Sequence, residues 1–124
     1  SLTITGHDLM RKKVGTQGEE LAVQYLRQKG YRILDRNYYS RYGEIDVICE
    51  RDRDIIFVEV KTRRSDRFGS AEESVTPAKQ QRLRKTALHY LQQRDQPFRE
   101  LRFDVITVRL GERDPVINHI KNAF

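Results

Sequence analysis

The chain has 124 residues, 37% of them hydrophobic and 34% charged, so it is long enough for one domain with a modest core. A net charge of +6, from 24 Lys and Arg against 18 Asp and Glu, fits a polyanionic partner such as nucleic acid, and equally a solvated basic surface. Arginine outnumbers lysine 17 to 7, which favours phosphate, because guanidinium groups match the geometry of phosphate oxygens.

Cysteine content and hydropathy exclude several classes of protein. The single cysteine, Cys49, excludes an intramolecular disulfide framework and a cysteine-based zinc site, and its strand-like surroundings predict a small buried side chain. No apolar run approaches the roughly 18 residues of a membrane span, and no signal-peptide pattern is present, so we expect a cytoplasmic protein without membrane contact. Residues 1–10 show no clear pattern, and we expect a flexible arm over 1–12, followed by a single domain over 13–124.

Two helices and five strands are predicted along the chain. Ala22, Val23 and Leu26 share one face of the first helix, and Thr76-Pro77 fits the N-cap and first position of the second. In chain order we expect a helix over 15–30, strands over 31–38, 43–49 and 54–61, a helix from 77 to about 94, and strands over 102–108 and 116–120. This α-β-β-β-α-β-β order predicts an α/β fold, with a mixed central sheet flanked by helices.

Charged side chains interrupt two of the apolar strands. Glu59 and Lys61 share a face of their strand, about 6.6 Å apart along it. Asp46 and Glu44 share a face of the preceding strand, and pairing of the two strands would bring Asp46 beside Glu59. A buried carboxylate is costly unless it is paired or binds a metal, and two adjacent carboxylates repel unless a proton or cation lies between them.

Two interpretations of these charges remain open. In the first, Asp46 and Glu59 bind Mg²⁺ or Mn²⁺, ions that accept one or two carboxylates, waters and substrate phosphate oxygens. Lys61 would then orient a water, help to deprotonate it, or neutralise charge on phosphorus. In the second, Lys61 forms an ion pair with Glu59 at a strand end, and Asp46 caps a turn.

Glu19 lies on the apolar face of the first helix, whereas Glu20 is rotated about 100° away and is expected to be exposed. The position of Glu19 fits a favourable interaction with the helix dipole, and equally a carboxylate aimed at the same cluster as Asp46. Glu44 is a peripheral candidate for that cluster.

Basic and aromatic side chains surround these acids in the sequence. We expect phosphate contacts from the loop after the third strand and from the start of the second helix, at Arg63, Arg64, Arg67, Lys79, Gln80 and Arg82. For each arginine the alternative is an ordinary solvated surface. Three tyrosines could stack on unpaired bases: Tyr38, Tyr39 and Tyr42. For these residues, packing against neighbouring side chains is the favoured interpretation. Asp104 is expected to pair with a nearby arginine.

The ordered motifs of the chain resemble one family of small bacterial proteins. They are Gly18-Glu19, Gly30-Tyr31, Arg36-Asn37-Tyr38, Gly43-Glu44-Ile45-Asp46, Phe57-Val58-Glu59-Val60-Lys61-Thr62-Arg63, Arg102-Phe103-Asp104-Val105 and His119-Ile120-x-Asn122-Ala123-Phe124. Over roughly residues 12–124 they resemble the YraN family, which is grouped with the PD-(D/E)XK nucleases, the superfamily of Holliday-junction resolvases and restriction endonucleases. Ile45 stands where the superfamily signature has proline.

The resemblance implies a restriction endonuclease-like α-β-β-β-α-β core with a metal site. Asp46, Glu59 and the Val60 carbonyl would bind Mg²⁺ or Mn²⁺, Lys61 would assist the water, and Glu19 would hold a metal-bound water or second ion. The expected function is a metal-dependent endonuclease that hydrolyses phosphodiester bonds in DNA, including branched or repair-intermediate DNA. The alternative is a non-catalytic nucleic-acid-binding module or DNA-processing adaptor that retains the fold. A homodimer is compatible with a small nuclease that acts on two strands.

Overall fold

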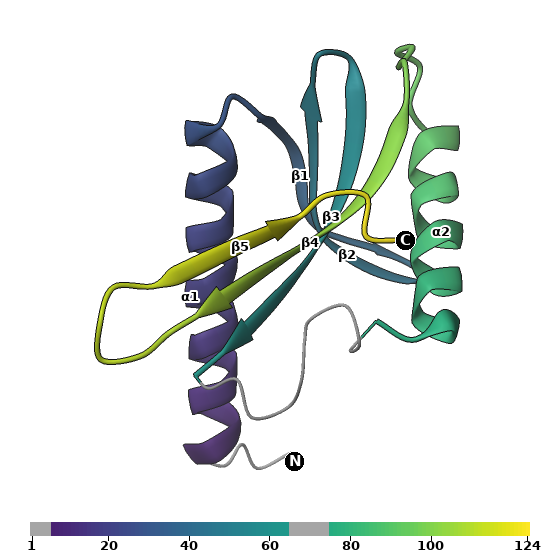
Figure 1. Ribbon diagram of the computed structural model, residues 1–124. Helices are drawn as coiled ribbons and strands as arrows, with labels where there is room; N and C mark the ends of the chain where they lie inside the picture. The colour runs from purple at the N-terminus through teal and green to yellow at the C-terminus, as the bar shows by residue number, and fades with distance from the viewer. Residues whose placement is uncertain (1–5, 65–74) are drawn as a thin grey trace.

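The computed structural model describes residues 6–64 and 75–124 and has the predicted α/β order (Figure 1). The elements are α1 (Gly6–Gln28), β1 (Arg32–Ser40), β2 (Gly43–Arg51), β3 (Asp54–Arg63), α2 (Pro77–Gln92), β4 (Leu101–Arg109) and β5 (Val116–Ile120). No helix in the described part of the chain is long and apolar enough to cross a membrane.

The five strands form one mixed sheet in the order β1-β2-β3-β4-β5. The pairs β1–β2, β2–β3 and β4–β5 are antiparallel, whereas β3 and β4 are parallel. Parallel neighbours need a crossover connection, and α2 supplies it between β3 and β4. The structure therefore confirms the mixed sheet and the α-β-β-β-α-β core.

Two hydrophobic clusters pack on opposite faces of the sheet, one under each helix (Figure 1). Val47 and Cys49 belong to the cluster under α1, and Ile48 to the cluster under α2, as alternation along a strand requires. Cys49 is fully buried as expected, and burial raises the pKa of its thiol to about 12. The thiol is therefore a small hydrophobic group within the core.

Helix α1 begins at Gly6, so the expected start at Gly15 was wrong, and residues 6–12 of the expected arm are helical. Its first turns have the polar sequence GHDLMRKK, which lacks the apolar period on which the prediction depended. The C-terminal end is as expected: Gly30 has φ +90°, and Tyr31 N–H donates to the Leu26 carbonyl. This is the Schellman arrangement that a C′ glycine favours.

Local signals account for two of the remaining boundaries. The hairpin between β2 and β3 turns at Asp52 and Arg53, both with positive φ, as a two-residue type I′ turn requires. Thr76 caps α2 through a 3.2 Å bond that its hydroxyl accepts from Lys79 N–H, and Pro77 is the first helical residue, as predicted. Helix α2 ends at Gln92, two residues before the expected Arg94.

Asp104 on β4 is the centre of a buried polar network. Arg102 donates two hydrogen bonds to its carboxylate, at 2.8 and 2.9 Å, which confirms the expected pairing with an arginine. His119 Nε2 lies 2.6 Å from the same carboxylate, and Asn122 N–H donates to it at 3.0 Å. The network joins the Arg-Phe-Asp-Val motif of β4 to the C-terminal motif that follows β5, so both motifs have a structural role.

Candidate active site

The antiparallel ladder between β2 and β3 ends just before the charged positions of both strands. Its last pair is Val47 with Val58, and the same register, continued by one residue, would place Asp46 opposite Glu59. Instead the strands separate, and the Asp46 carboxylate accepts a 2.8 Å hydrogen bond from Val60 N–H. The separation opens a space beyond the end of the β2–β3 ladder, which both residues line, because backbone pairing no longer fills it.

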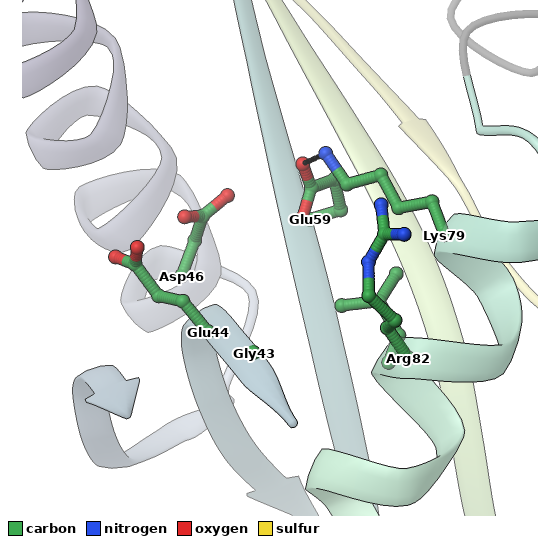
Figure 2. Close-up of a pocket in the computed structure, with 7 residues that line it drawn as sticks. Gly43, Glu44, Asp46, Glu59, Lys79 and Arg82 are labelled. Carbon is green, nitrogen blue, oxygen red and sulfur yellow. Dashed lines mark hydrogen bonds and ion pairs between the residues drawn. The ribbon is translucent and has the colours of Figure 1, made fainter. Parts of the chain in front are cut away.

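The space is a pocket of about 260 Å³ between the strands and α2. It is lined by Gly43, Glu44, Asp46, Glu59, Lys79, Arg82 and Leu83. Figure 2 shows the acids of β2 on one side and the basic side chains of α2 on the other, with Glu59 of β3 between them. The pocket therefore combines carboxylates from two strands with cationic groups from a helix on the following crossover.

Glu59 lies in a cationic environment although its side chain is buried. Lys79 Nζ is 2.6 Å from Glu59 Oε1, and Lys61 Nζ is 3.5 Å from the same oxygen. Glu59 and Lys61 share a face of β3 as predicted. The ion pair between them, which the sequence offered as the alternative to a metal site, is present. The contact with Lys79 had no signal in the sequence, because 20 residues and a loop separate the two positions.

Asp46 has fewer compensating contacts than Glu59. Burial raises its pKa to about 7, and the negative charge of Glu59 adds to this effect. The Val60 N–H bond works in the opposite direction, while Glu19 and Glu44 raise the pKa further. A cation placed beside Asp46 would favour the ionised form of its carboxyl group, because the cation supplies the charge compensation that the protein does not.

The two lysines have shifted pKa values of opposite direction. Burial and the neighbouring charge of Lys79 lower the pKa of Lys61, and Glu59 only partly compensates. Burial also works to lower the pKa of Lys79, but the hydrogen bond and charge of Glu59 outweigh it and raise the pKa above its ordinary value. Lys79 is thus the ammonium that Glu59 holds more firmly, and Lys61 is the one that gives up a proton more readily.

Glu19 approaches the pocket from α1, on the other side of the sheet. Helix α1 comes close to β3 at Gly18, where any Cβ would collide with the Thr62 side chain. Glu19 accepts a 2.9 Å hydrogen bond from Asn37, and burial raises its pKa. Its negative charge also raises the pKa of Asp46. Glu20, by contrast, is more exposed and pairs with Arg36 at 3.0 Å. Both placements agree with the predicted helix faces.

The partners of Glu19 were missed as site residues, although Arg36-Asn37 belongs to a motif of the sequence resemblance. Arg36 Nη2 lies 3.9 Å from Glu19 Oε1, and Asn37 adopts φ +52° within β1. Positive φ is uncommon for a residue other than glycine, and asparagine tolerates it better than most. The strand thereby turns the Asn37 amide toward α1, a placement that no periodicity could have indicated.

Two carboxylates and a backbone carbonyl are the donor set that the sequence resemblance implies for a divalent ion. Asp46 and Glu59 line one pocket, and the negative charge of Glu59 raises the pKa of Asp46. A pair of carboxylates that repel each other in this way fits a hard cation that keeps several waters. Within residues 6–64 and 75–124, no three His, Cys, Asp or Glu side chains are gathered as a metal-binding group. Glu19 is accordingly a neighbour that raises the pKa of Asp46 through its charge, and it does not line the pocket with the two acids.

The expected phosphate-binding residues have different surroundings. Arg82 lines the pocket, and Lys79 contacts Glu59. Gln80 donates its side-chain amide to the Val75 carbonyl at 3.0 Å, and Arg64 is exposed after β3. Arg63 is the last residue of β3, and Arg67 lies outside the described residues.

The three tyrosines near the β1–β2 turn divide between packing and exposure. Tyr38 packs edge-on against Tyr90, with ring centroids 5.2 Å apart, as the favoured interpretation expected. Tyr42 stacks with the guanidinium of Arg41, whose carbon is 4.9 Å from the ring centroid. Tyr39 is 70% exposed, so packing does not describe it.

Comparison with known proteins shows the family of the chain. The model of the uncharacterised protein family UPF0102 matches residues 18–108. A UPF0102 protein of Syntrophomonas wolfei is 55% identical over 115 residues, covering 93% of this chain and 100% of the relative. UPF0102 proteins of Alkaliphilus oremlandii and Vibrio parahaemolyticus are each 50% identical, and the matches cover 93% and 92% of this chain and 100% and 93% of the relatives. The chain therefore belongs to the family UPF0102, the YraN family that its sequence resembles.

Proposed function

We propose that the protein is a divalent-metal-dependent nuclease that hydrolyses phosphodiester bonds in DNA, with branched or repair-intermediate DNA as its substrate. The observation that carries the proposal is the pocket where β2 and β3 separate. Asp46 and Glu59 meet there, and two lysines and an arginine lie within the same site. A protein that only bound nucleic acid would need the cations, but it would gain nothing from a buried Glu59 and a half-buried Asp46 that repel phosphate.

Each side chain has a role in this chemistry that follows from its surroundings. Asp46, Glu59 and the Val60 carbonyl would hold Mg²⁺ or Mn²⁺, an ion that polarises a phosphate oxygen and lowers the pKa of water. Lys61 would orient the attacking water and exchange a proton with it, a role that its lowered pKa favours. Arg82, on the α2 side of the pocket, would bind a phosphate oxygen of the substrate.

The test is cleavage of labelled single-stranded, duplex, flap and four-way-junction DNA by the full chain with Mg²⁺ or Mn²⁺. We expect cleavage to fall at least about 100-fold in Asp46→Asn and in Lys61→Met, since each removes a group acting at the reacting phosphate. Glu112→Gln and Lys121→Met alter exposed side chains after β4 and β5, and should cleave like the wild type. Activity that persists unchanged in both site variants would reject the proposal.

A second candidate is a DNA-binding module that keeps this fold without cutting. The 2.6 Å contact between Lys79 and Glu59 favours it, because the ammonium already neutralises a carboxylate that a metal would need. Electrophoretic mobility shift of the same four substrates in EDTA, next to the cleavage assay, separates the two candidates. Binding without cleavage in either metal would support the module.

A further inference from the structure

The position of Lys79 raises a question that the proposed nuclease site leaves open. Its ammonium is 2.6 Å from Glu59 Oε1, and Lys61 lies 3.5 Å from that oxygen. Two ammonium groups on one carboxylate oxygen oppose the binding of a divalent cation to that carboxylate, through competition for its lone pairs and through charge repulsion. A metal bound to Glu59 must displace at least the nearer of the two.

Lys79 is the group that can leave. It belongs to the first turn of α2, where Thr76 caps the helix, and Val75 and Leu83 hold this end of α2 in the core beneath it. Its backbone is therefore fixed, whereas its side chain is a flexible stem of four methylene groups that carries the terminal ammonium to Glu59. Lys61, by contrast, projects from the same face of the same strand as Glu59, and its ammonium lies farther from the oxygen, at 3.5 Å against 2.6 Å for Lys79.

The released ammonium would stay in the same pocket, beside Arg82, one turn further along α2. Figure 2 shows both side chains coming from α2 on the side of the pocket where Glu59 lies. Two cations from one helix at that place form an anion site that is masked while Glu59 holds Lys79. A phosphate group is the chemical class that fits, because it accepts from both an ammonium and a guanidinium.

We infer that Lys79 is an exchangeable cation, which a divalent ion displaces from Glu59 and which then, with Arg82, binds a phosphate group of the substrate. The inference rests on the proposed metal site and adds a coupling to it. A divalent ion and a phosphate should each strengthen the binding of the other, by the same factor, as linkage requires. Without phosphate, Lys79 keeps the affinity for the metal low.

Calorimetric titration with Mn²⁺ tests the exchange without any cleavage assay. The full-length wild type, Lys79→Met and the control Lys85→Met are compared, with and without dimethyl phosphate, a soluble phosphodiester. Lys85 lies exposed on the same helix. We expect Lys79→Met to bind Mn²⁺ at least about fivefold more tightly than the wild type in the absence of the diester, the lower end of typical coupling between sites. Dimethyl phosphate should tighten Mn²⁺ binding to the wild type and to Lys85→Met, and should have no effect on Lys79→Met.

The possible failures are distinguishable. If the wild type binds Mn²⁺ and Lys79→Met binds it with the same or lower affinity, the exchange is overturned and the proposed metal site stays in place. No binding to either protein, with Lys79→Met shown to be folded by circular dichroism, would reject the metal site and the exchange together. Binding to Lys79→Met alone would support the exchange in its strongest form. Lys79→Gln, which keeps a polar side chain, should reproduce the affinity of Lys79→Met if the ammonium charge is what competes.

Discussion

Two aspartates of the same sheet, the half-buried Asp46 on β2 and the fully buried Asp104 on β4, have pKa values shifted in opposite directions. Burial would raise the pKa of Asp104, but hydrogen bonds from His119, Arg102 and Asn122 outweigh it and lower the pKa below the ordinary value. Asp46 receives one backbone hydrogen bond and has Glu59 as its neighbour, and its pKa rises to about 7. Asp104 is fully buried and Asp46 only half-buried, so the number of donors, and not the degree of burial, accounts for the lower pKa of Asp104.

The comparison distinguishes a structural carboxylate from one that is available for binding. A buried charge that is fully hydrogen-bonded holds its partners in one arrangement, and Asp104 does this for the C-terminal segment after β5. A buried carboxylate with few donors is costly in the folded chain, and a cation from outside can relieve that cost. Strongly raised pKa values with a specific neighbouring charge are typical of functional sites.

The largest expected effect concerns stability and compares Asp104→Asn with Asp46→Asn. The first substitution leaves Arg102 without its buried counter-charge, disturbs the hydrogen bond with His119, and should cost about 3–5 kcal/mol of unfolding free energy. The second removes an unfavourable charge and should change stability by less than about 1 kcal/mol at pH 7, or increase it. Urea unfolding followed by circular dichroism measures both. Equal losses would mean that the two carboxylates are equivalent.

The next effect is the pH dependence of stability without metal. For Asp46 the folded pKa of about 7 exceeds the ordinary 3.8, so the folded state holds the proton more tightly, and its contribution to stability falls as pH rises from about 4 to 7. The fall should be on the order of 2–4 kcal/mol in the wild type and absent from Asp46→Asn. Asp104 behaves oppositely, since its lowered pKa gives stability that is lost as pH falls below about 4. Parallel pH profiles for wild type and Asp46→Asn would contradict this prediction.

A smaller effect is expected from metal binding. If Asp46 is the cation ligand, Mn²⁺ at 100 times its dissociation constant should add about 2.7 kcal/mol of stability at pH 8. The affinity should fall about tenfold for each pH unit below 7, because a proton on Asp46 competes with the ion. Thermal unfolding with and without Mn²⁺ measures this, with Glu112→Gln as a control that keeps the effect. Stabilisation of the same size at pH 5 and pH 8 would exclude Asp46 as the ligand.

The smallest expected effect tests the neighbours of Asp46 one at a time. Glu19→Gln should lower the pKa of Asp46 by roughly half a unit, because it removes one negative charge acting across the sheet edge. Glu59→Gln should lower it further, since Glu59 is the larger contributor. Carboxyl-carbon NMR titration gives these values directly. Glu20→Gln serves as the control, because Glu20 pairs with Arg36 and should leave Asp46 unchanged.

Element order and strand faces were predictable from the sequence, and the N-terminal part of α1 was not. Alternation placed Glu59 and Lys61 on one face of β3, and helical period turned Glu19 toward the sheet, because each depends on neighbours along the chain. Thr76-Pro77 marked the start of α2 for the same reason. The first turns of α1 gave no such signal, since a polar helix carries no apolar period.

The sequence by itself determined which residues carry charge into the apolar strands, and which face of each strand or helix they occupy. Only the tertiary structure decided that β2 and β3 separate beyond the Val47–Val58 pair. Asp46 therefore accepts a hydrogen bond from Val60 N–H and does not continue the ladder. It also brought Lys79 onto Glu59, across a crossover of parallel strands. Periodicity is a local property of the chain, whereas the number of donors around a buried carboxylate depends on every element that folds against it. For that reason the sequence indicated an arginine partner for Asp104, but only the fold shows how many donors surround Asp104 and Asp46.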